Sequence, residues 1–288
     1  MPVRPRRVPF MGALLVLLVL PAPAARPSQA AAPGSEAATL TQALAQAGDY
    51  CARLTRASID FVCLEEVTER IQERNPVYPS SAFGQPGWRN DVVEHQYLYD
   101  YQFVTEHGQK TEKRRVLKID GIKRKDEASD LDTLTYIYKN VLFGAVDLLD
   151  ETRQGFYRYA LKGREMMDGQ PALVIEATPA PGLAVDIHRG TVWLRESDAA
   201  ILKIVWNGAS LERNAAIRMT AKEFKGAPQI LQVTEFGLEK NGVRFPTRFA
   251  VEEAYITKRG RKIVRSTMDA VYRDYKFFTV EVATTGIK

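Results

Sequence analysis

Histidine and cysteine are scarce in this chain, which has three histidines and two cysteines among 288 residues. His95, His107 and His188 do not have the spacing of a metal site. The sequence also lacks the G-x-S-x-G, H-E-x-x-H and glycine-rich phosphate-loop motifs that carry common catalytic chemistries. We therefore expect no metal, no cofactor and no catalytic residues, and an enzyme such as a hydrolase is the weakest hypothesis.

Paired acidic residues do not change that expectation. Glu65-Glu66 and Glu252-Glu253 are adjacent within predicted strands, so their side chains should point to opposite faces. They form no ready acid–base pair. Carboxylates from distant strands could still meet in one cleft, and such a cluster would favour an enzyme.

Long apolar runs are also missing, apart from one near the start. Arg4, Arg6 and Arg7 precede an apolar run over residues 11–20, and Ala22-Pro23-Ala24 fits a small-residue cleavage site. This pattern predicts a signal peptide over residues 1–25, since the run is too short to span a membrane. No cysteine follows it closely, so we expect no lipoprotein anchor. The predicted location is the periplasm, with no transmembrane segment in the mature chain.

The basic character of the chain is mostly in this leader. Removing residues 1–25 takes away three arginines and no acidic residue, so the net charge falls from +5 to +2. A balance so close to neutral, outside the cytoplasm, makes nucleic acid an improbable partner.

Cys51 and Cys63 are the two cysteines of the chain. In an exported protein an isolated pair is more often bridged than free. On one continuous helix they would lie roughly 18 Å apart, so a bridge requires a chain reversal between them. A helix over residues 39–56 followed by a strand over 59–71 would supply it. We expect a Cys51–Cys63 disulfide, and two buried free thiols are the alternative.

The remaining pattern predicts a mainly β, α+β fold in one domain. Residues 26–38 are rich in Pro, Ala, Ser and Gly and are expected to be a disordered lead-in to a domain spanning 39–288. Alternating strands follow one another through tight turns such as Asp120-Gly121 and Asn241-Gly242. Consecutive long strands of this kind favour one curved antiparallel sheet. Helices are expected at 39–56, 133–152 and 210–225, covering its concave face.

An aromatic stripe stands out within the segment QYLYDYQFV at residues 96–104. Tyr97, Tyr99, Tyr101 and Phe103 occupy alternate positions, so a strand would place all four rings on one face. Ordinary core packing would explain them. Three of the rings carry hydroxyls, however, and a sheet lined with amphipathic rings suits a greasy ligand with a polar end. We predict that the four line a ligand cavity.

A long loop precedes that stripe. Residues 74–90 hold three prolines and two glycines together with aromatic residues, and loops of this length are usually functional or disordered. Phe83 and Trp88 are predicted lid residues of the ligand site.

A basic stretch follows the stripe, at residues 110–125. It carries eight Lys and Arg side chains. The solvated face of a hairpin is the favoured interpretation, and a surface for anionic lipid or an acidic partner is the alternative.

Several hairpin motifs resemble those of outer-membrane lipoprotein-sorting (LolA-like) carriers. GREMMDGQPALVIEATP at 163–179 and GTVWLRESDAAILKIVWNG at 190–208 resemble the paired hairpins of that family, and NGVRFPTRF at 241–249 resembles its late G-x-x-F-P strand. The resemblance implies a half-open antiparallel β-barrel plugged by helices around an apolar cavity. It also implies a cofactor-free carrier of acyl chains. No residue here matches the carriers' functional arginine.

These observations favour a periplasmic carrier or chaperone that binds a lipid or an acylated lipoprotein. The second hypothesis is an envelope sensor or scaffold that uses the same fold to bind a protein partner.

Overall fold

The computed structural model describes residues 33–57, 60–77, 87–106, 109–124, 138–139, 141–182, 189–207 and 215–278. The predicted signal peptide, residues 26–32 of the predicted lead-in and Phe83 lie outside these ranges. No helix within them is long and apolar enough to cross a membrane.

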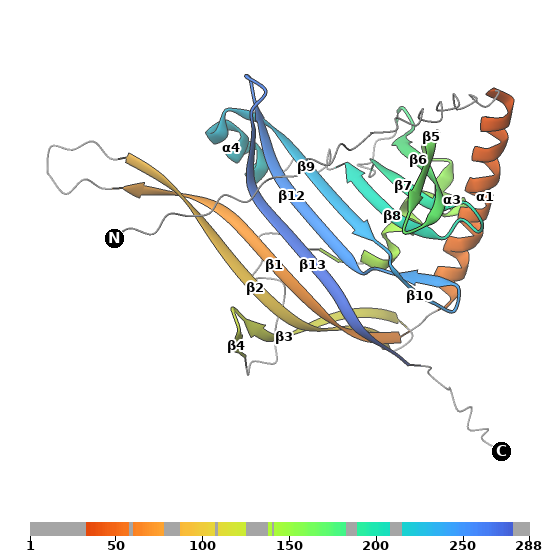
Figure 1. Ribbon diagram of the computed structural model, residues 1–288, viewed down its shortest axis with the longest axis horizontal. Coiled ribbons are helices and arrows are strands. Elements are labelled where there is room, and N and C mark those ends of the chain that lie inside the picture. Colours follow the sequence, from red (N-terminus) through yellow and green to blue (C-terminus); the bar gives the residue numbers. More distant parts are fainter. Residues whose placement is uncertain are drawn as a thin grey trace, which may run out of the picture.

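One antiparallel sheet forms the body of the molecule (Figure 1). Its strand order is β4-β3-β2-β1-β13-β12-β9-β8-β7-β6-β5, and β10 and β11 form a separate two-stranded sheet. The bounds are β1 (Asp60–Val77), β2 (Gly87–Glu106), β3 (Gln109–Ile119), β4 (Ile122–Lys123), β5 (Tyr157–Met167), β6 (Gln170–Pro179), β7 (Arg189–Arg195), β8 (Ile201–Asn207), β9 (Gly226–Glu235), β10 (Leu238–Lys240), β11 (Val243–Phe245), β12 (Arg248–Thr257) and β13 (Lys262–Phe278). The strand order does not close on itself, so the predicted curved half-barrel is confirmed.

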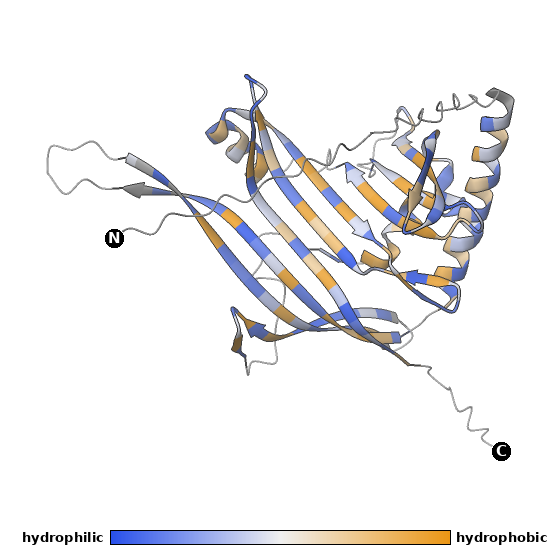
Figure 2. Ribbon diagram, in the orientation of Figure 1, coloured by the Kyte–Doolittle hydropathy of each residue, from blue (hydrophilic) through white to orange (hydrophobic). Residues whose placement is uncertain are grey.

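Tight turns set the register of the hairpins. Asp120-Gly121 and Asn241-Gly242 both have positive φ at both positions, 49° and 78° in the first and 53° and 71° in the second. Such turns match the twist of the strands they join. Hydropathy alternates along the long strands as a consequence of the two-residue repeat (Figure 2).

Short helices and one long helix cover part of the concave face. They are α1 (Pro33–Ala57), η2 (Val141–Phe143), α2 (Gly144–Leu149), α3 (Glu151–Gln154) and α4 (Ala215–Phe224). The predicted helix over 133–152 is therefore broken, because Asp150 leaves the helical conformation and caps α3 through its bond from the Thr152 amide, 3.0 Å long. α1 also begins at Pro33, inside the predicted lead-in.

The helix α1 packs through one stripe of side chains. Ala43, Ala47, Tyr50, Cys51 and Leu54 are buried at helical spacing. They join a single hydrophobic cluster that includes the inward side chains of both halves of the sheet. The Gln154 side chain donates to the Leu44 carbonyl of α1 at 2.9 Å, so α1 and α3 are held together as parts of one cover.

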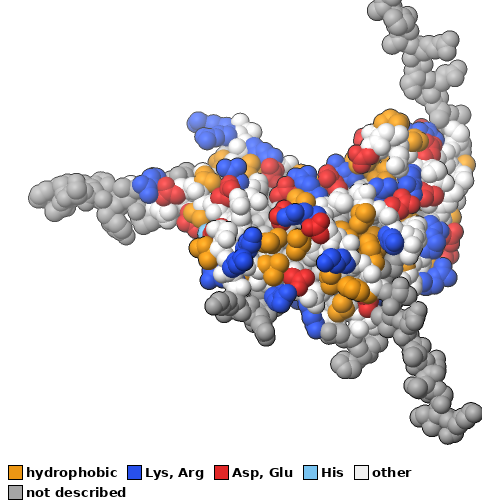
Figure 3. Space-filling view, turned by 60° about the horizontal axis from the view of Figure 1, so that its bottom comes forward, with side chains coloured by type: hydrophobic (Ala, Val, Ile, Leu, Met, Phe, Trp, Pro, Cys, Tyr) orange, Lys and Arg blue, Asp and Glu red, His pale blue; other side chains and the backbone are white. Residues whose placement is uncertain are grey.

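Charges of both signs mix on the surface shown in Figure 3, with hydrophobic side chains between them. Some of the charged side chains on the surface form salt bridges. Examples are Arg248 with Asp269 at 2.8 Å and Lys262 with Glu252 at 2.7 Å. In this view no single sign dominates, which agrees with the near-neutral balance of residues 26–288.

The predicted disulfide does not form. Cys51 and Cys63 are both buried free thiols. The Cys51 sulfur faces the Ala145 carbonyl of α2 at 4.0 Å, whereas Cys63 lies on β1 and contacts Tyr275 of β13. The chain reversal exists, but α1 turns its cysteine toward the cover helices rather than toward β1.

The two thiols should be unreactive until the protein unfolds. Burial raises the pKa of Cys51 to about 12, and burial together with the nearby Glu65 carboxylate raises that of Cys63 even further. Thiolate is the reactive form, so maleimide labelling at neutral pH should be negligible in the native protein. It should reach two thiols per chain in denaturant without reductant. Fewer than two would indicate a bridge and contradict the structure.

Candidate functional site

The aromatic stripe lies on the concave face of β2 and is fully enclosed. Tyr97, Tyr99, Tyr101 and Phe103 are at most 5% exposed. Cross-strand pairing places Tyr99 opposite Glu65 and Phe103 opposite Phe61. The Phe103 ring stacks on Phe61 with centroids 5.5 Å apart. The rings thus occupy the face that was predicted for a ligand, where they pack against neighbouring strands and helices.

Trp88 is not close to this stripe. It lies near the start of β2, opposite Pro76 of β1. Nine residues of extended strand separate it from Tyr97, which is roughly 30 Å at 3.3 Å per residue. The structure therefore does not bring the two parts of the predicted site together.

A buried charged cluster lies beside the stripe, and we call it the Glu65 cluster. Its members are Glu65 on β1, Tyr101 on β2, Glu112 and Arg114 on β3, and Tyr138 just before η2. The Arg114 guanidinium donates to both carboxylate oxygens of Glu65, at 2.6 and 3.3 Å, and lies 2.9 Å from Glu112. The side chains of Glu65, Glu112 and Arg114 are at most 7% exposed.

Two tyrosines also donate hydrogen bonds to the carboxylates of this cluster. Tyr138 donates to Glu65 at 2.8 Å and Tyr101 donates to Glu112 at 2.9 Å. The Arg114 guanidinium also lies between their rings, 4.5 Å from the Tyr101 centroid and 4.8 Å from that of Tyr138, a favourable cation–π geometry. A buried ion pair loses the hydration of both charges, and hydrogen bonds of this kind help to offset that loss of free energy.

The protonation of the cluster follows from this arrangement. Burial alone would lower the pKa of Arg114, but the Glu65 carboxylate raises it well above its usual value. Burial and the neighbouring carboxylates raise the pKa of Tyr101 and Tyr138 well above 10. The cluster therefore holds a permanent cation and neutral hydroxyl donors, aimed at two carboxylates.

Sequence reasoning missed this cluster, although one signal was present. Glu65 falls in phase with Phe61, Cys63 and Val67 on the alternating pattern of β1, so an acid occupies an inward position. The partner could not be identified, because Arg114 is one of many basic residues in the stretch 110–125. That stretch is a hairpin as predicted, but Arg114 points inward.

A pocket of about 250 Å³ opens between the cover and the concave face of the sheet. We call it the concave pocket. Its apolar walls include Val141 and Gly144 of the cover and Trp206 and Phe249 of the sheet. Its polar lining residues are Lys139 and Asp147, which are exposed, together with Gln232 and the buried Thr234.

Tyr138 connects the concave pocket to the Glu65 cluster. Its ring lines the pocket and packs on Phe249 with centroids 5.0 Å apart. Its hydroxyl points the other way and donates to Glu65. One side chain therefore lies between the concave pocket and a buried charged site.

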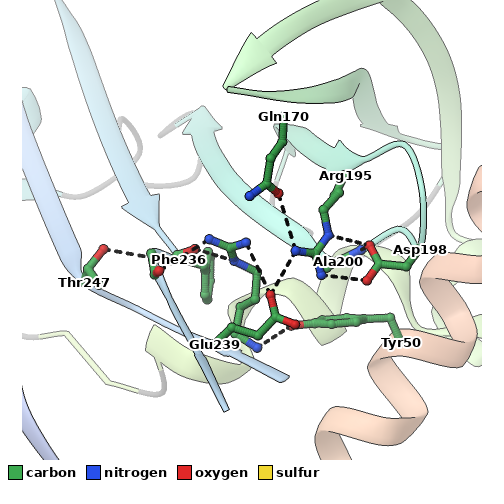
Figure 4. Close-up of polar contacts among 10 residues, drawn as sticks. Tyr50, Gln170, Arg195, Asp198, Ala200, Phe236, Glu239 and Thr247 are labelled. Atoms are coloured by element: carbon green, nitrogen blue, oxygen red, sulfur yellow. Dashed lines mark hydrogen bonds and ion pairs between the residues drawn. The ribbon is translucent and has the colours of Figure 1, made fainter. Parts of the chain in front are cut away.

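A second polar network fixes α1 over the sheet (Figure 4). The Arg195 guanidinium binds Asp198 at 2.6 and 2.7 Å and Glu239 at 2.9 Å, which ties the β7–β8 turn to β10. The Arg244 amide of β11 donates to the Tyr50 hydroxyl of α1 at 2.9 Å. The cover is thus held both by apolar packing and by a few identifiable hydrogen bonds.

No protein-family model matches this sequence, and no curated protein does either. Solved structures do. A DUF1329 family protein from Desulfovibrio piger is 14% identical, with a TM-score of 0.34, and the match covers 85% of this chain and 95% of that protein. A LolA superfamily protein from Nitrosomonas europaea is 14% identical, with a TM-score of 0.30 and coverages of 84% and 94%.

A third similar structure is a putative outer membrane lipoprotein-sorting protein domain from Vibrio parahaemolyticus. It is 11% identical, with a TM-score of 0.33, and the match covers 88% of this chain and 94% of that domain. The solved structures similar to this chain thus include members of the LolA-like group whose hairpin motifs its sequence resembles.

Proposed function

We propose that this protein is a periplasmic carrier that holds the acyl chain of a lipid or lipoprotein between the concave face of its sheet and the helical cover. The observation that carries the proposal is the concave pocket, whose walls come from the cover on one side and from β8, β9 and β12 on the other. Such a function needs no chemical step and no cofactor.

The pocket has the character of a site for an amphiphile. Trp206 and Phe249 provide apolar surface inside, and each acyl methylene removed from water contributes about 0.8 kcal/mol. Lys139 and Asp147 at the rim keep charged groups near water. The volume is close to the lower end of the ligand pockets of proteins, about 300 Å³, so a long chain requires the cover to shift.

Gly144 offers a direct way to close the pocket. A Cβ added at this residue would lie 3.0 Å from the Trp206 ring, on the pocket wall. We expect Gly144→Leu to lower the affinity for a fluorescent acyl probe at least tenfold, because the leucine side chain fills space that the acyl chain needs. Titration of the probe into delipidated protein measures this.

Gly155→Leu is the matched control. Gly155 ends α3 on the same cover, has an ordinary φ of −61°, and a Cβ there would meet nothing within 4 Å. Its affinity for the probe should stay within about twofold of wild type, since a change of that size is under 1 kcal/mol. Equal affinities in the two variants would place the acyl chain elsewhere and count against the proposed pocket.

The protein-partner hypothesis has one feature of its own in its favour. Residues 72–77 of β1 and 87–92 of β2 pair with each other beyond the points where β13 stops pairing with β1 and β3 stops pairing with β2. They project from the sheet as a two-stranded arm (Figure 1). Within the described residues both edges of this arm lack a neighbouring strand, and such edges can receive a strand from a partner.

A further inference from the structure

The hydroxyl of Tyr272 has no hydrogen-bond partner among the residues that the structure describes, although its oxygen is buried. Tyr272 lies on β13, directly opposite Glu65 of β1, and is 4% exposed. Its ring meets the Tyr101 ring edge-on, with centroids 5.9 Å apart. The Tyr272 side chain therefore packs against the Glu65 cluster through the Tyr101 ring.

Three neighbouring tyrosines, unlike Tyr272, do have hydrogen-bond partners within the part of the chain that the structure describes. The Tyr101 and Tyr138 hydroxyls donate to carboxylates, and the Tyr275 hydroxyl donates to the Pro246 carbonyl at 2.5 Å. A buried polar group without a partner destabilises a protein, whereas phenylalanine would fill the same space without that cost. A buried hydroxyl that lacks a partner among the described residues points to a ligand that pairs with it.

The charges around Tyr272 restrict the chemistry of that ligand. Burial, Glu65 and Tyr138 raise the pKa of Tyr272 well above 10, so it is a neutral O–H donor. The cluster next to it contains two carboxylates and one guanidinium. An anionic ligand at Tyr272 would lie beside the Glu65 carboxylate in surroundings of low polarity, so the fitting group is an uncharged hydrogen-bond acceptor.

The concave pocket and Tyr272 lie on the same face of the sheet. Tyr138 alone among the cluster residues lines the pocket, and its hydroxyl donates to Glu65, the residue directly opposite Tyr272 on β1. Phe249 of the pocket wall pairs across β13 with Ala270, two residues before Tyr272 on the same face. A ligand that displaces Tyr138 would therefore extend from the Phe249 side of the concave pocket, along β13, to the Tyr272 hydroxyl.

We propose that Tyr272 binds the carbonyl oxygen of the ester or amide that links the acyl chain to its carrier molecule. This deepens the proposed carrier function and rests on it. The specificity that follows is for neutral acyl esters and amides, over free fatty acids and over ethers of the same length.

The test compares three probes of one chain length on the full mature protein: methyl laurate, dodecyl methyl ether and laurate. Competition against a fluorescent acyl probe gives their affinities. The ester should bind about tenfold more tightly than the ether, which lacks the carbonyl, since one hydrogen bond to a buried donor has about that effect. Laurate should bind less tightly than the ester. In Tyr272→Phe, the preference for ester over ether should disappear.

Stability supplies an independent readout in the ligand-free protein. Tyr272→Phe should leave the melting temperature unchanged or raise it, because the variant loses no hydrogen bond of the described structure. Tyr275→Phe is the matched control on the same strand, and it should melt at a lower temperature while retaining the ester preference, because its hydroxyl has a partner in Pro246.

The outcomes separate the two proposals. If none of the three probes binds, the carrier function fails and this inference fails with it. If all bind with equal affinity, or if Tyr272→Phe keeps the ester preference, the acyl pocket stands and the role of Tyr272 is overturned. A lower melting temperature for Tyr272→Phe would show that its hydroxyl already has a partner, which also overturns the inference.

Discussion

Arg114→Met is expected to lower the free energy of unfolding by about 3–5 kcal/mol, the usual effect of removing one partner from a buried ion pair. Methionine preserves much of the side-chain length, so little of the loss comes from packing. What is lost is the guanidinium between Glu65 and Glu112, whose carboxylates would stay buried without their cation. Urea denaturation followed by circular dichroism measures the change.

Arg115→Met is the control, because Arg115 is the next residue along β3 and faces outward. Its side chain is 54% exposed and pairs with Asp100 at 3.0 Å. Exposed pairs of this kind contribute about 0.2–1 kcal/mol, so this variant should be close to wild type. Similar losses in both variants would contradict the inward placement of Arg114.

A double variant separates charge from shape. Adding Glu65→Gln to Arg114→Met removes one of the stranded carboxylates, so the double variant should be less destabilised than the sum of the two single changes. Residues in one network typically show a coupling of about 0.5–3 kcal/mol. Strict additivity would mean that the two side chains do not interact.

Phe61→Ala is expected to lower the free energy of unfolding by about 3–5 kcal/mol, as is usual for a buried phenylalanine cut back to alanine. Phe61 is fully buried and lies where β1, β2, β11 and β13 meet. Its ring contacts five others at centroid distances of 5.2 to 6.2 Å, namely Tyr101, Phe103, Phe245, Tyr275 and Phe277. The cavity would lie among rigid rings that cannot easily collapse into it.

Phe156→Ala is the comparison for this change, because Phe156 is 42% exposed in the turn before β5. It should alter the free energy of unfolding by no more than about 0.5–1 kcal/mol, as substitutions away from the core do. Chemical denaturation of both variants provides the measurement. A Phe61→Ala protein as stable as Phe156→Ala would show that the aromatic junction is not the core described here.

The sequence predicted the architecture well because its signals are local. Asn241-Gly242 and Asp120-Gly121 marked hairpin turns, and the alternation from Tyr97 to Phe103 placed those rings on one face. The chain is interrupted between β11 and β12, which are separate strands. Pro246 cannot donate to a ladder, and the chain changes partners there, from β10 to β9 and β13.

The charged site was harder to predict because its contacts are not local. The alternation of β1 predicts that Glu65 points inward. Its partner Arg114 is 49 residues away in the sequence, within a stretch of many basic residues. The sequence likewise allowed a Cys51–Cys63 bridge, since a helix and a strand with a reversal between them permit it. The rotation of α1, which aims Cys51 at Ala145, depends on packing of the whole cover.

Native mass spectrometry of the mature protein, purified without detergent and followed by lipid extraction, tests the central claim most directly. Wild type should carry about one acyl species per chain or take one up from an added acyl ester, and Gly144→Leu should not. A ligand-free mass for wild type, with no uptake of added lipid or lipopeptide, would contradict the carrier function. The arm formed by residues 72–77 and 87–92 would then be the place to look for a protein partner.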